Sequence, residues 1–480
     1  MGHFAAGRGR APPKAARCQV QASLQRRARL PTLSTEPLEG GCLAKEGNMG
    51  RRGLVACAVV VGCLITAGSA WASKTVCSSG CAYTSIQSAV NAASPGATIT
   101  IGPGSYFENV VVDRPVTLLG SGLTTVVYPA TSNPACGGGS LCGGSASNIF
   151  LVQADNVTIS GMLLNGDSPN LTSGVVVGGA DVDARNGIIT NHELGTYNGL
   201  TVSKVKVTNV YLRGLYASSG GSFNFNHDTV ENVQGSEASI GIFNFGGSGV
   251  IASNKVTNAN DAISANWSTG TQFLSNVVTK SASGIHTDNN GGKGGSADLI
   301  KGNRVRECRP DGYGIWVFVP YLSATVETNT VKGCAVGLAA FGSAVSGQGP
   351  TFAANRATGL EASTTNPGGT YGVYLTTDEL GFEFGDVTAT LTGNTIVHFG
   401  TGVLATQTSP SPGSSAGGQA TVTASNNIIH PNGVGANGEA GTSVNAQNNW
   451  WGCTQGPNVG VHCDTAIGTV SYTPWLTVKP

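Results

Sequence analysis

The chain has 480 residues, with 26 Lys and Arg, 26 Asp and Glu, 71 glycines and only 11% charged residues. Many glycines and few charges indicate numerous tight turns and few amphipathic helices, which argues against an ordinary globular α/β enzyme. One long repetitive domain is therefore expected after the N-terminal region.

The N-terminal region has the features of a leader. Residues 1–48 are rich in Arg and Ala without apolar periodicity, and we interpret them as a mis-assigned or disordered segment. Residues 49–72 combine two arginines, an apolar stretch and small residues, which is typical of a secretory signal peptide cleaved after Ala72. An unusually long leader, or lipid attachment at Cys63, are the alternatives. No other segment approaches the roughly 20 apolar residues of a membrane span. We expect a secreted or cell-envelope protein, periplasmic or extracellular, formed by residues 73–480.

Residues 73–96 are expected to form an N-terminal cap of the domain. The segment from Thr84 to Gln87 has capping-box spacing, and helical periodicity then continues until Pro95 and Gly96. Short alternating runs at residues 97–101, 109–112 and 116–119 follow, separated by turns that contain Gly, Pro and Asp. These runs predict the first strands.

A repeat runs through the rest of the chain, in which an asparagine precedes Gly-Ile, Gly-Leu or Gly-Val at a fixed spacing. Successive asparagines are 22, 27, 26 and 26 residues apart at Asn254, Asn276, Asn303, Asn329 and Asn355. This length matches one coil of a β-solenoid with three short strands. The sequence predicts a right-handed parallel β-helix over residues 97–450, closed by a C-terminal cap at 451–480. The asparagines are interpreted as stacked turn residues that satisfy backbone groups.

Removal of residues 1–72 leaves 16 basic and 23 acidic residues. The resulting net charge of about −7 argues against nucleic-acid binding.

Eight of the twelve cysteines remain after this removal. No Cys/His cluster resembles a zinc site, so no metal site is expected. The expected disulfides are Cys77 with Cys81, Cys136 with Cys142, Cys308 with Cys334, and Cys453 with Cys463. Cys308 and Cys334 each follow a repeat asparagine by five residues, which places them on adjacent coils within disulfide reach. Free buried thiols are the alternative.

The segment from Tyr83 to Gly122 resembles the N-terminal cap and first coils of pectin-lyase-like proteins, and Gly104-x-Tyr106-x-Glu108 is similar to the first pectinesterase motif. The ending NNWWG to YTPWL resembles that of secreted bacterial β-helix repeat proteins. The resemblance implies the fold over residues 73–480. The later motifs of pectinesterases and polygalacturonases are missing, so neither activity is expected.

Strand alternation predicts two outward rows of side chains beside the inward aliphatic residues. The first row is Tyr216, Phe243, Ser264, His286, Trp316, Ala339 and Tyr374. The second row is Ser218, Phe245, Asn266, Asp288, Phe318 and Phe341. A row of aromatic rings at about one hexose length could bind successive sugars. Burial of the aromatics under long loops is the alternative.

Three polar sets carry further hypotheses. His286 and Asp288 lie on one side of a strand and could act as an acid and a base, or be an exposed polar pair without chemistry. The basic set Lys280, Arg304, Arg306 and Arg309 could bind uronate carboxylates or stabilise an enolate-like intermediate, or be solvated charges. The acidic loop with Asp378, Glu379, Glu383 and Asp386 could hold Ca²⁺, although its spacing matches no defined calcium loop.

These observations support two functions. The first is an exported protein that binds an extracellular polysaccharide and cleaves or modifies it as a lyase, hydrolase or epimerase, with no cofactor required. The second is a non-catalytic cell-envelope structural or adhesion protein. A monomer is expected in both cases.

Overall fold

The structure is a computed structural model that describes residues 74–288, 295–317, 322–342, 349–360, 369–377, 385–407 and 417–480. The leader and signal peptide predicted for residues 1–72 lie outside these ranges. Within them, no helix has the length and apolar character needed to cross a membrane.

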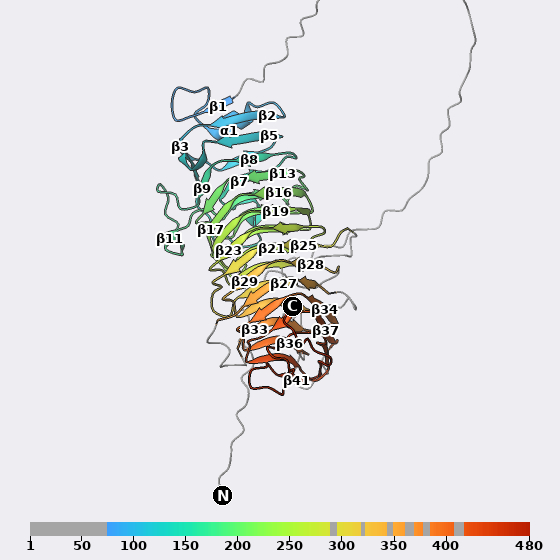
Figure 1. Ribbon diagram of the computed structural model, residues 1–480. Coiled ribbons are helices and arrows are strands. Elements are labelled where there is room, and N and C mark those ends of the chain that lie inside the picture. Colours follow the sequence, from blue (N-terminus) through green and yellow to red (C-terminus); the bar gives the residue numbers. More distant parts are fainter. Residues whose placement is uncertain are drawn as a thin grey trace, which may run out of the picture. The chain divides into compact units, whose positions relative to one another are not determined.

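Nearly all described strands belong to three stacked parallel sheets (Figure 1). Sheet A consists, in stacking order, of β1 (Lys74–Val76), β2 (Ala97–Ile101), β5 (Val116–Gly120), β8 (Thr158–Ser160), β13 (Leu200–Ser203), β16 (Ser222–Asn226), β19 (Ser248–Ala252), β22 (Gln272–Leu274), β25 (Leu299–Lys301), β28 (Thr325–Glu327), β31 (Thr351–Ala353), β34 (Val387–Thr392), β37 (Ala420–Ser425), β40 (Thr442–Asn445) and β42 (Val470–Ser471). Sheet B consists of β3 (Gly104–Phe107), β6 (Thr125–Tyr128), β9 (Leu163–Asn165), β14 (Lys206–Thr208), β17 (Thr229–Val233), β20 (Lys255–Ala259), β23 (Val277–Thr279), β26 (Arg304–Arg306), β29 (Thr330–Lys332), β32 (Arg356–Thr358), β35 (Thr395–Val397) and β38 (Ile428–Ile429). Sheet C consists of β4 (Val110–Val112), β7 (Asn148–Val152), β12 (Asn186–Thr190), β15 (Arg213–Ala217), β18 (Ile240–Phe245), β21 (Asp261–Asn266), β24 (Ser283–Thr287), β27 (Tyr313–Val317), β30 (Val336–Phe341), β33 (Tyr371–Thr376), β36 (Thr401–Thr406), β39 (Val434–Gly438) and β41 (Ala466–Gly468). A short antiparallel hairpin joins β10 (Val176–Val177) to β11 (Ala180–Asp181).

Each coil from β2 to β39 contributes one strand to sheet A, then one to sheet B and one to sheet C, as β22, β23 and β24 do in turn. The next coil pairs with it in parallel and in register, so that Ile263 is paired with Ile285 and Ile285 with Ile315. This topology confirms the predicted right-handed parallel β-helix.

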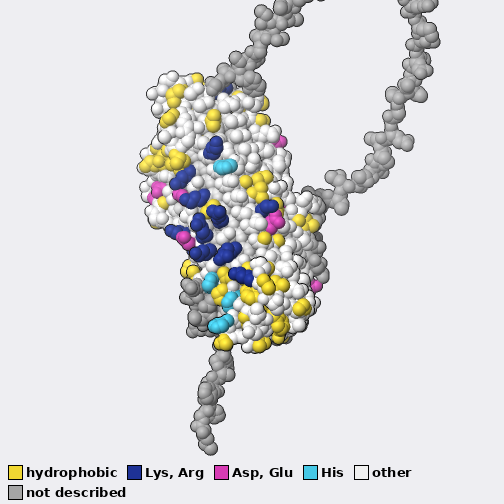
Figure 2. All heavy atoms as spheres, in the orientation of Figure 1, with side chains coloured by type: hydrophobic (Ala, Val, Ile, Leu, Met, Phe, Trp, Pro, Cys, Tyr) yellow, Lys and Arg dark blue, Asp and Glu magenta, His cyan; other side chains and the backbone are white. Residues whose placement is uncertain are grey.

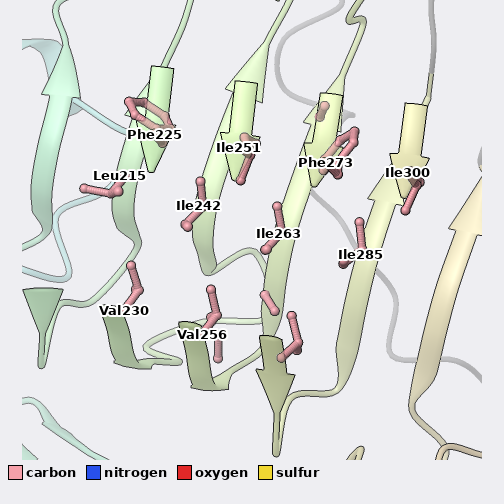
Figure 3. Close-up of a cluster of buried hydrophobic side chains, with 14 of the residues drawn as sticks. Leu215, Phe225, Val230, Ile242, Ile251, Val256, Ile263, Phe273, Ile285 and Ile300 are labelled. Carbon is pink, nitrogen blue, oxygen red and sulfur yellow. The ribbon is translucent and has the colours of Figure 1, made fainter. Parts of the chain in front are cut away.

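The core lies between the three sheets and is built from aliphatic and aromatic rows that stack coil on coil. Figure 3 shows Ile242, Ile263 and Ile285 of sheet C near the row of sheet A that contains Phe273, and all of these are fully buried. A glycine precedes most of these inward aliphatic residues, although Ala262 precedes Ile263, and the coils approach closely at this position. A Cβ on Gly284 would collide with the carbonyl oxygen of Gly314 in the next coil.

The asparagines form a buried hydrogen-bonded ladder at the turn between sheets A and B. The backbone N of Asn276 donates to Oδ1 of Asn303 at 2.8 Å, and its Nδ2 donates to the same oxygen at 2.9 Å and to the carbonyl of Ile251 at 2.8 Å. The same contacts recur along the ladder, for example from Asn303 to Asn329. The predicted structural role of these asparagines is confirmed.

The N-terminal helix α1 (Ile86–Asn91) begins one residue later than the capping-box spacing predicts. Ser85 is the N-cap, and its hydroxyl accepts from the backbone N of Ser88 at 3.2 Å. Glu108 from the first coil accepts from the backbone N atoms of Ile86 and Gln87 at 2.8 and 2.9 Å. A carboxylate at a helix N-terminus is favourable, so the glutamate of the pectinesterase-like motif has a structural contact here.

The ends of the β-helix differ in part from the sequence expectation. Strands β2, β4 and β5 occupy the predicted runs, but β3 follows the Gly-Pro-Gly turn and was missed. Strands β41 and β42 extend sheets C and A into the segment expected to be only a cap, and Trp451 is fully buried in the main core.

All four predicted disulfides are present, joining Cys77 to Cys81, Cys136 to Cys142, Cys308 to Cys334, and Cys453 to Cys463. The third bond links adjacent coils with its Cα atoms 4.8 Å apart, as the coil alignment predicts.

Candidate functional site

The first outward row of sheet C has the predicted register, but its side chains are not exposed. Tyr216 is paired with Phe243, and His286 with Trp316. The exposed fraction is 6% for Tyr216, 3% for Phe243 and 8% for Trp316, and Tyr374 is half-buried. The rings pack on one another instead, with the centroids of Tyr216 and Phe243 4.6 Å apart. The expectation of a solvated groove along this row is wrong. Alternation along a strand shows on which side of the sheet a side chain lies, but not whether that side chain is exposed to solvent.

The second outward row is also closed in large part. Ser218, Asp288 and Phe341 are buried, Phe245 and Asn266 are half-buried, and Phe318 lies outside the described residues. A sugar-binding role of both rows stays a prediction for which this structure offers no exposed surface.

His286 of β24 belongs to a buried polar network that differs from the predicted pair. Its Nε2 lies 2.6 Å from Oγ of Ser264 and 3.2 Å from Oδ1 of Asn266, and its Nδ1 lies 3.1 Å from Oδ2 of Asp261. Nδ1 of His286 makes no hydrogen bond to this carboxylate within the described residues. Asp288 accepts from the backbone N of Trp267.

Asp261 was not predicted as a site residue from the sequence, although alignment of the coils places it beside His286. Asp261 is paired with Ser283, and Ser264 with His286, so the carboxylate and the imidazole come from adjacent coils. A carboxylate, an imidazole and a hydroxyl in this order resemble a nucleophilic triad. Ser264 is completely buried, however, and the His286 ring packs on Trp316 with centroids 4.2 Å apart. As it stands, the network is closed to a substrate.

Sheet B, in contrast, presents exposed cations. We call six residues the basic face, which are Lys255, Lys280, Arg304, Arg306, Lys332 and Arg356. Figure 2 shows Lys and Arg side chains gathered on one side of the molecule, over the part of Figure 1 that contains β17, β23 and β29. All six are exposed, and within the described ranges none forms an ion pair. The nearby Glu231 and Glu327 are paired with Lys206 and Lys301, at 2.8 Å in both cases.

The register of sheet B arranges five of these cations in two columns, and Lys280 lies in the turn directly after β23. Lys255, Arg304 and Arg356 share one column on every second coil, about 10 Å apart. Arg306 and Lys332 are direct neighbours in the other column. Like charges directly opposite one another destabilise a sheet, so this pair favours an anionic ligand.

Arg309, which the sequence grouped with these cations, has a different role. Its guanidinium donates to Oδ1 of Asn260 at 2.6 Å and to Oδ1 of Asn258 at 3.0 Å, and its Nε donates to the carbonyl of Lys280 at 3.2 Å. Burial lowers the pKa of Arg309. The side chain ties three coils together and is not available to an anion.

An aromatic platform lies at the N-terminal end of sheet B. It consists of Phe107 of β3 and Tyr128 of β6, whose rings stack with centroids 5.2 Å apart and an interplanar angle of 13°. Beside it is an open hollow of about 340 Å³, lined by Ser78, Thr84, Ser85, Ser105, Tyr106, Phe107 and Glu108.

Metal ligands do not gather within the described residues, where no group of three or more His, Cys, Asp or Glu side chains could hold an ion. Of the predicted calcium loop, Asp378, Glu379 and Glu383 lie outside the described ranges. Asp386 accepts from the backbone N of Gln419 at 2.8 Å.

Comparison with known proteins finds one family model, described as "Periplasmic copper-binding protein (NosD)", which matches residues 220–460. The search of curated proteins finds no match.

Among solved structures, the A-module of the mannuronan C-5 epimerase AlgE6 from Azotobacter vinelandii is 16% identical, covers 81% of this chain and 94% of its own, and has a TM-score of 0.47. The catalytic unit of the GH87 α-1,3-glucanase from Streptomyces thermodiastaticus is 17% identical, covers 82% of this chain and 66% of its own, and has a TM-score of 0.48. An alginate lyase from Paenibacillus is 16% identical, covers 64% of this chain and 91% of its own, and has a TM-score of 0.37. Sequence identities and TM-scores this low support no conclusion about function.

Proposed function

This chain belongs to the NosD family of periplasmic copper-binding proteins, and we propose that it binds an acidic polysaccharide outside the cytoplasm through its basic face. The family description, the four disulfides and the predicted signal peptide all support a periplasmic or extracellular location.

The observation that carries the proposal is the basic face, whose six exposed cations, five on strands of sheet B and Lys280 directly after β23, form no ion pair within the described residues. Neighbouring coils are about 4.8 Å apart, which is close to the length of one hexose in a linear chain. A polysaccharide that lies along the stacking direction would therefore bring an acidic sugar to Arg304, and others to Arg306 and Lys332. Guanidinium groups bind carboxylates in a bidentate manner, which suits this class of ligand.

The proposal includes no chemical step. The residues of the sheet C network that could act as acid, base or nucleophile are buried, and Ser264 is out of reach of a substrate. The same burial favours the second candidate, a non-catalytic envelope protein that attaches to a partner other than a polysaccharide.

Copper enters the proposal only as a test of fit, because the family description names it. Histidine, cysteine and methionine are the usual ligands of copper in proteins. The described cysteines are all in disulfides, Met162 is buried in the core, and no group of potential ligands gathers in the part of the chain that the structure describes. These residues do not fit a copper site, and we derive no role for the metal.

The test is a binding measurement on the exported protein with polygalacturonate and with a neutral glucan, at low and at high salt. We expect binding of the acidic polymer alone, weakened by salt because exposed charges are screened. Loss of two charge-assisted contacts in the Arg306→Gln, Lys332→Gln variant should weaken binding at least tenfold. Lys479→Gln, which removes an exposed charge at the C-terminal end, is the matched control. Equal binding by both variants would refute the role of the basic face.

A further inference from the structure

We propose that the aromatic platform and the hollow beside it form a sugar-stacking subsite at the N-terminal end of sheet B. The inference rests on the proposed function, since it assigns a second contact point to the same polysaccharide. The ligand at this point is a sugar ring that stacks on Phe107 and hydrogen-bonds to the hydroxyl groups lining the hollow.

The position of Phe107 leaves one face of its ring open within sheet B. Strand β3 is the edge strand of the sheet and is paired with β6 alone. One face of Phe107 therefore packs on Tyr128, while no strand of sheet B covers the other, and the side chain is 37% exposed and lines the hollow. Tyr128 is half-buried, whereas Phe107 stays exposed, and packing does not explain an exposed ring here because ring burial is what normally stabilises such pairs.

The lining of the hollow suits a sugar and not a lipid chain. Ser78, Thr84 and Ser105 are exposed and their hydroxyls make no hydrogen bond within the described protein. Glu108 is held in place by Ser85 and by the backbone of α1, so one rim of the hollow is a fixed carboxylate. An apolar wall with a few convergent polar groups is the usual composition of a ligand site, and 340 Å³ is enough for a small ligand.

The platform lies in line with the basic face. Phe107 and Tyr128 share a register column of sheet B that leads through β9, β14, β17, β20 and β23 to Arg306 and Lys332. Seven coil steps separate β3 from β26, which is about 34 Å at about 4.8 Å for each step. A single polysaccharide lying along this column would reach both points only if it has at least about seven sugars.

This length requirement gives the test. The full chain, exported and purified, is titrated with oligogalacturonates of about three and about ten residues, one shorter and one longer than the distance between the two points. Loss of the stacking ring in Phe107→Ala should weaken binding of the long oligomer by about 3- to 10-fold, and leave the short one unchanged. Phe107→Trp should retain the affinity, and its fluorescence should change with the long oligomer only.

A second variant distinguishes loss of the aromatic ring from misfolding of Phe107→Ala. Phe107→Leu keeps an apolar side chain of similar size but has no ring, so it should be as stable as the parent and bind as weakly as Phe107→Ala. Full affinity of Phe107→Ala for the long oligomer, with Arg306→Gln weakened, would overturn the subsite and leave the basic face intact. Weakened binding of the short oligomer in Phe107→Ala would overturn the separation of the two points. No binding of either oligomer by the parent protein would refute both proposals.

Discussion

Asp228 stands where the asparagine ladder would have another asparagine, 26 residues before Asn254, and replacing it should stabilise the protein. Its backbone N donates to Oδ1 of Asn254 at 2.8 Å, and its Oδ1 accepts from the backbone N of Val205 at 2.9 Å, as in the other ladder positions. Its Oδ2, however, is buried without a hydrogen bond, where each following asparagine has an Nδ2 that donates to a backbone carbonyl. Asp228→Asn restores this donor.

The magnitude follows from the protonation of the carboxyl group. Burial raises the pKa of Asp228 to about 8, against the opposing effect of backbone hydrogen bonds from Val205 and Asn226. In the unfolded chain the pKa is about 3.9, so holding the proton at pH 7 costs roughly 4 kcal/mol at about 1.4 kcal/mol for each pH unit. The recovered hydrogen bond adds about 1 kcal/mol. We expect Asp228→Asn to raise the free energy of unfolding by about 1 to 4 kcal/mol at pH 7, allowing for relaxation of the buried site.

The pH dependence gives the sharper assay. Between about pH 4 and pH 8 the folded state holds a proton that the unfolded state has released, so stability falls as pH rises and becomes level above about pH 8. Asp228→Asn should lack this part of the slope. Denaturant unfolding followed by circular dichroism at several pH values measures both quantities. A variant that is no more stable than the parent at pH 7, with the same slope, would falsify this account of Asp228.

Three further predictions use the same unfolding assay. Asn303→Ala should lower stability by about 3 kcal/mol, because it leaves several buried backbone and amide groups unpaired, and an unchanged midpoint would contradict the importance of the ladder. Replacing Cys308 and Cys334 by serine opens a 26-residue loop and should lower the free energy of unfolding by about 3 kcal/mol, and an unchanged unfolding midpoint would contradict the role of this bond. Ser264→Ala should lower the free energy of unfolding by about 1 kcal/mol and leave polysaccharide binding unchanged. Lost binding would instead show that the sheet C network around His286 takes part in the binding site.

The fold could be predicted from the sequence because each coil repeats its constraints. The spacing from Asn303 to Asn329 fixed the coil length, and the cysteines five residues after each were therefore correctly placed on neighbouring coils. The spacing of 26 residues to Asn254 could also have identified Asp228 as a ladder position, but the repeat was defined by asparagine and residue 228 is an aspartate.

The site was harder to predict because exposure depends on the whole molecule. Trp316 and Arg304 both point away from the core, yet Trp316 is buried and Arg304 is exposed. Nothing in the alternation of a single strand separates these cases. Residue type does not separate these cases either, because Arg309 differs from the exposed Arg304. Arg309 lies in a turn, where amide oxygens of earlier coils accept from its guanidinium.

The asparagine ladder also has an electrical polarity. Each Oδ1 atom from Asp228 to Asn449 accepts from the coil before, and each ladder backbone N–H from Asp228 to Asn427 donates to the coil after. Aligned amide dipoles add along a row, as they do along an α-helix. The oxygen end of this row is at Asp228, so the aligned dipoles disfavour a negative charge there and act in the same direction as burial. The β-helix thus has a direction set by its amides, and its one acidic ladder residue lies at the end where a proton is held most firmly.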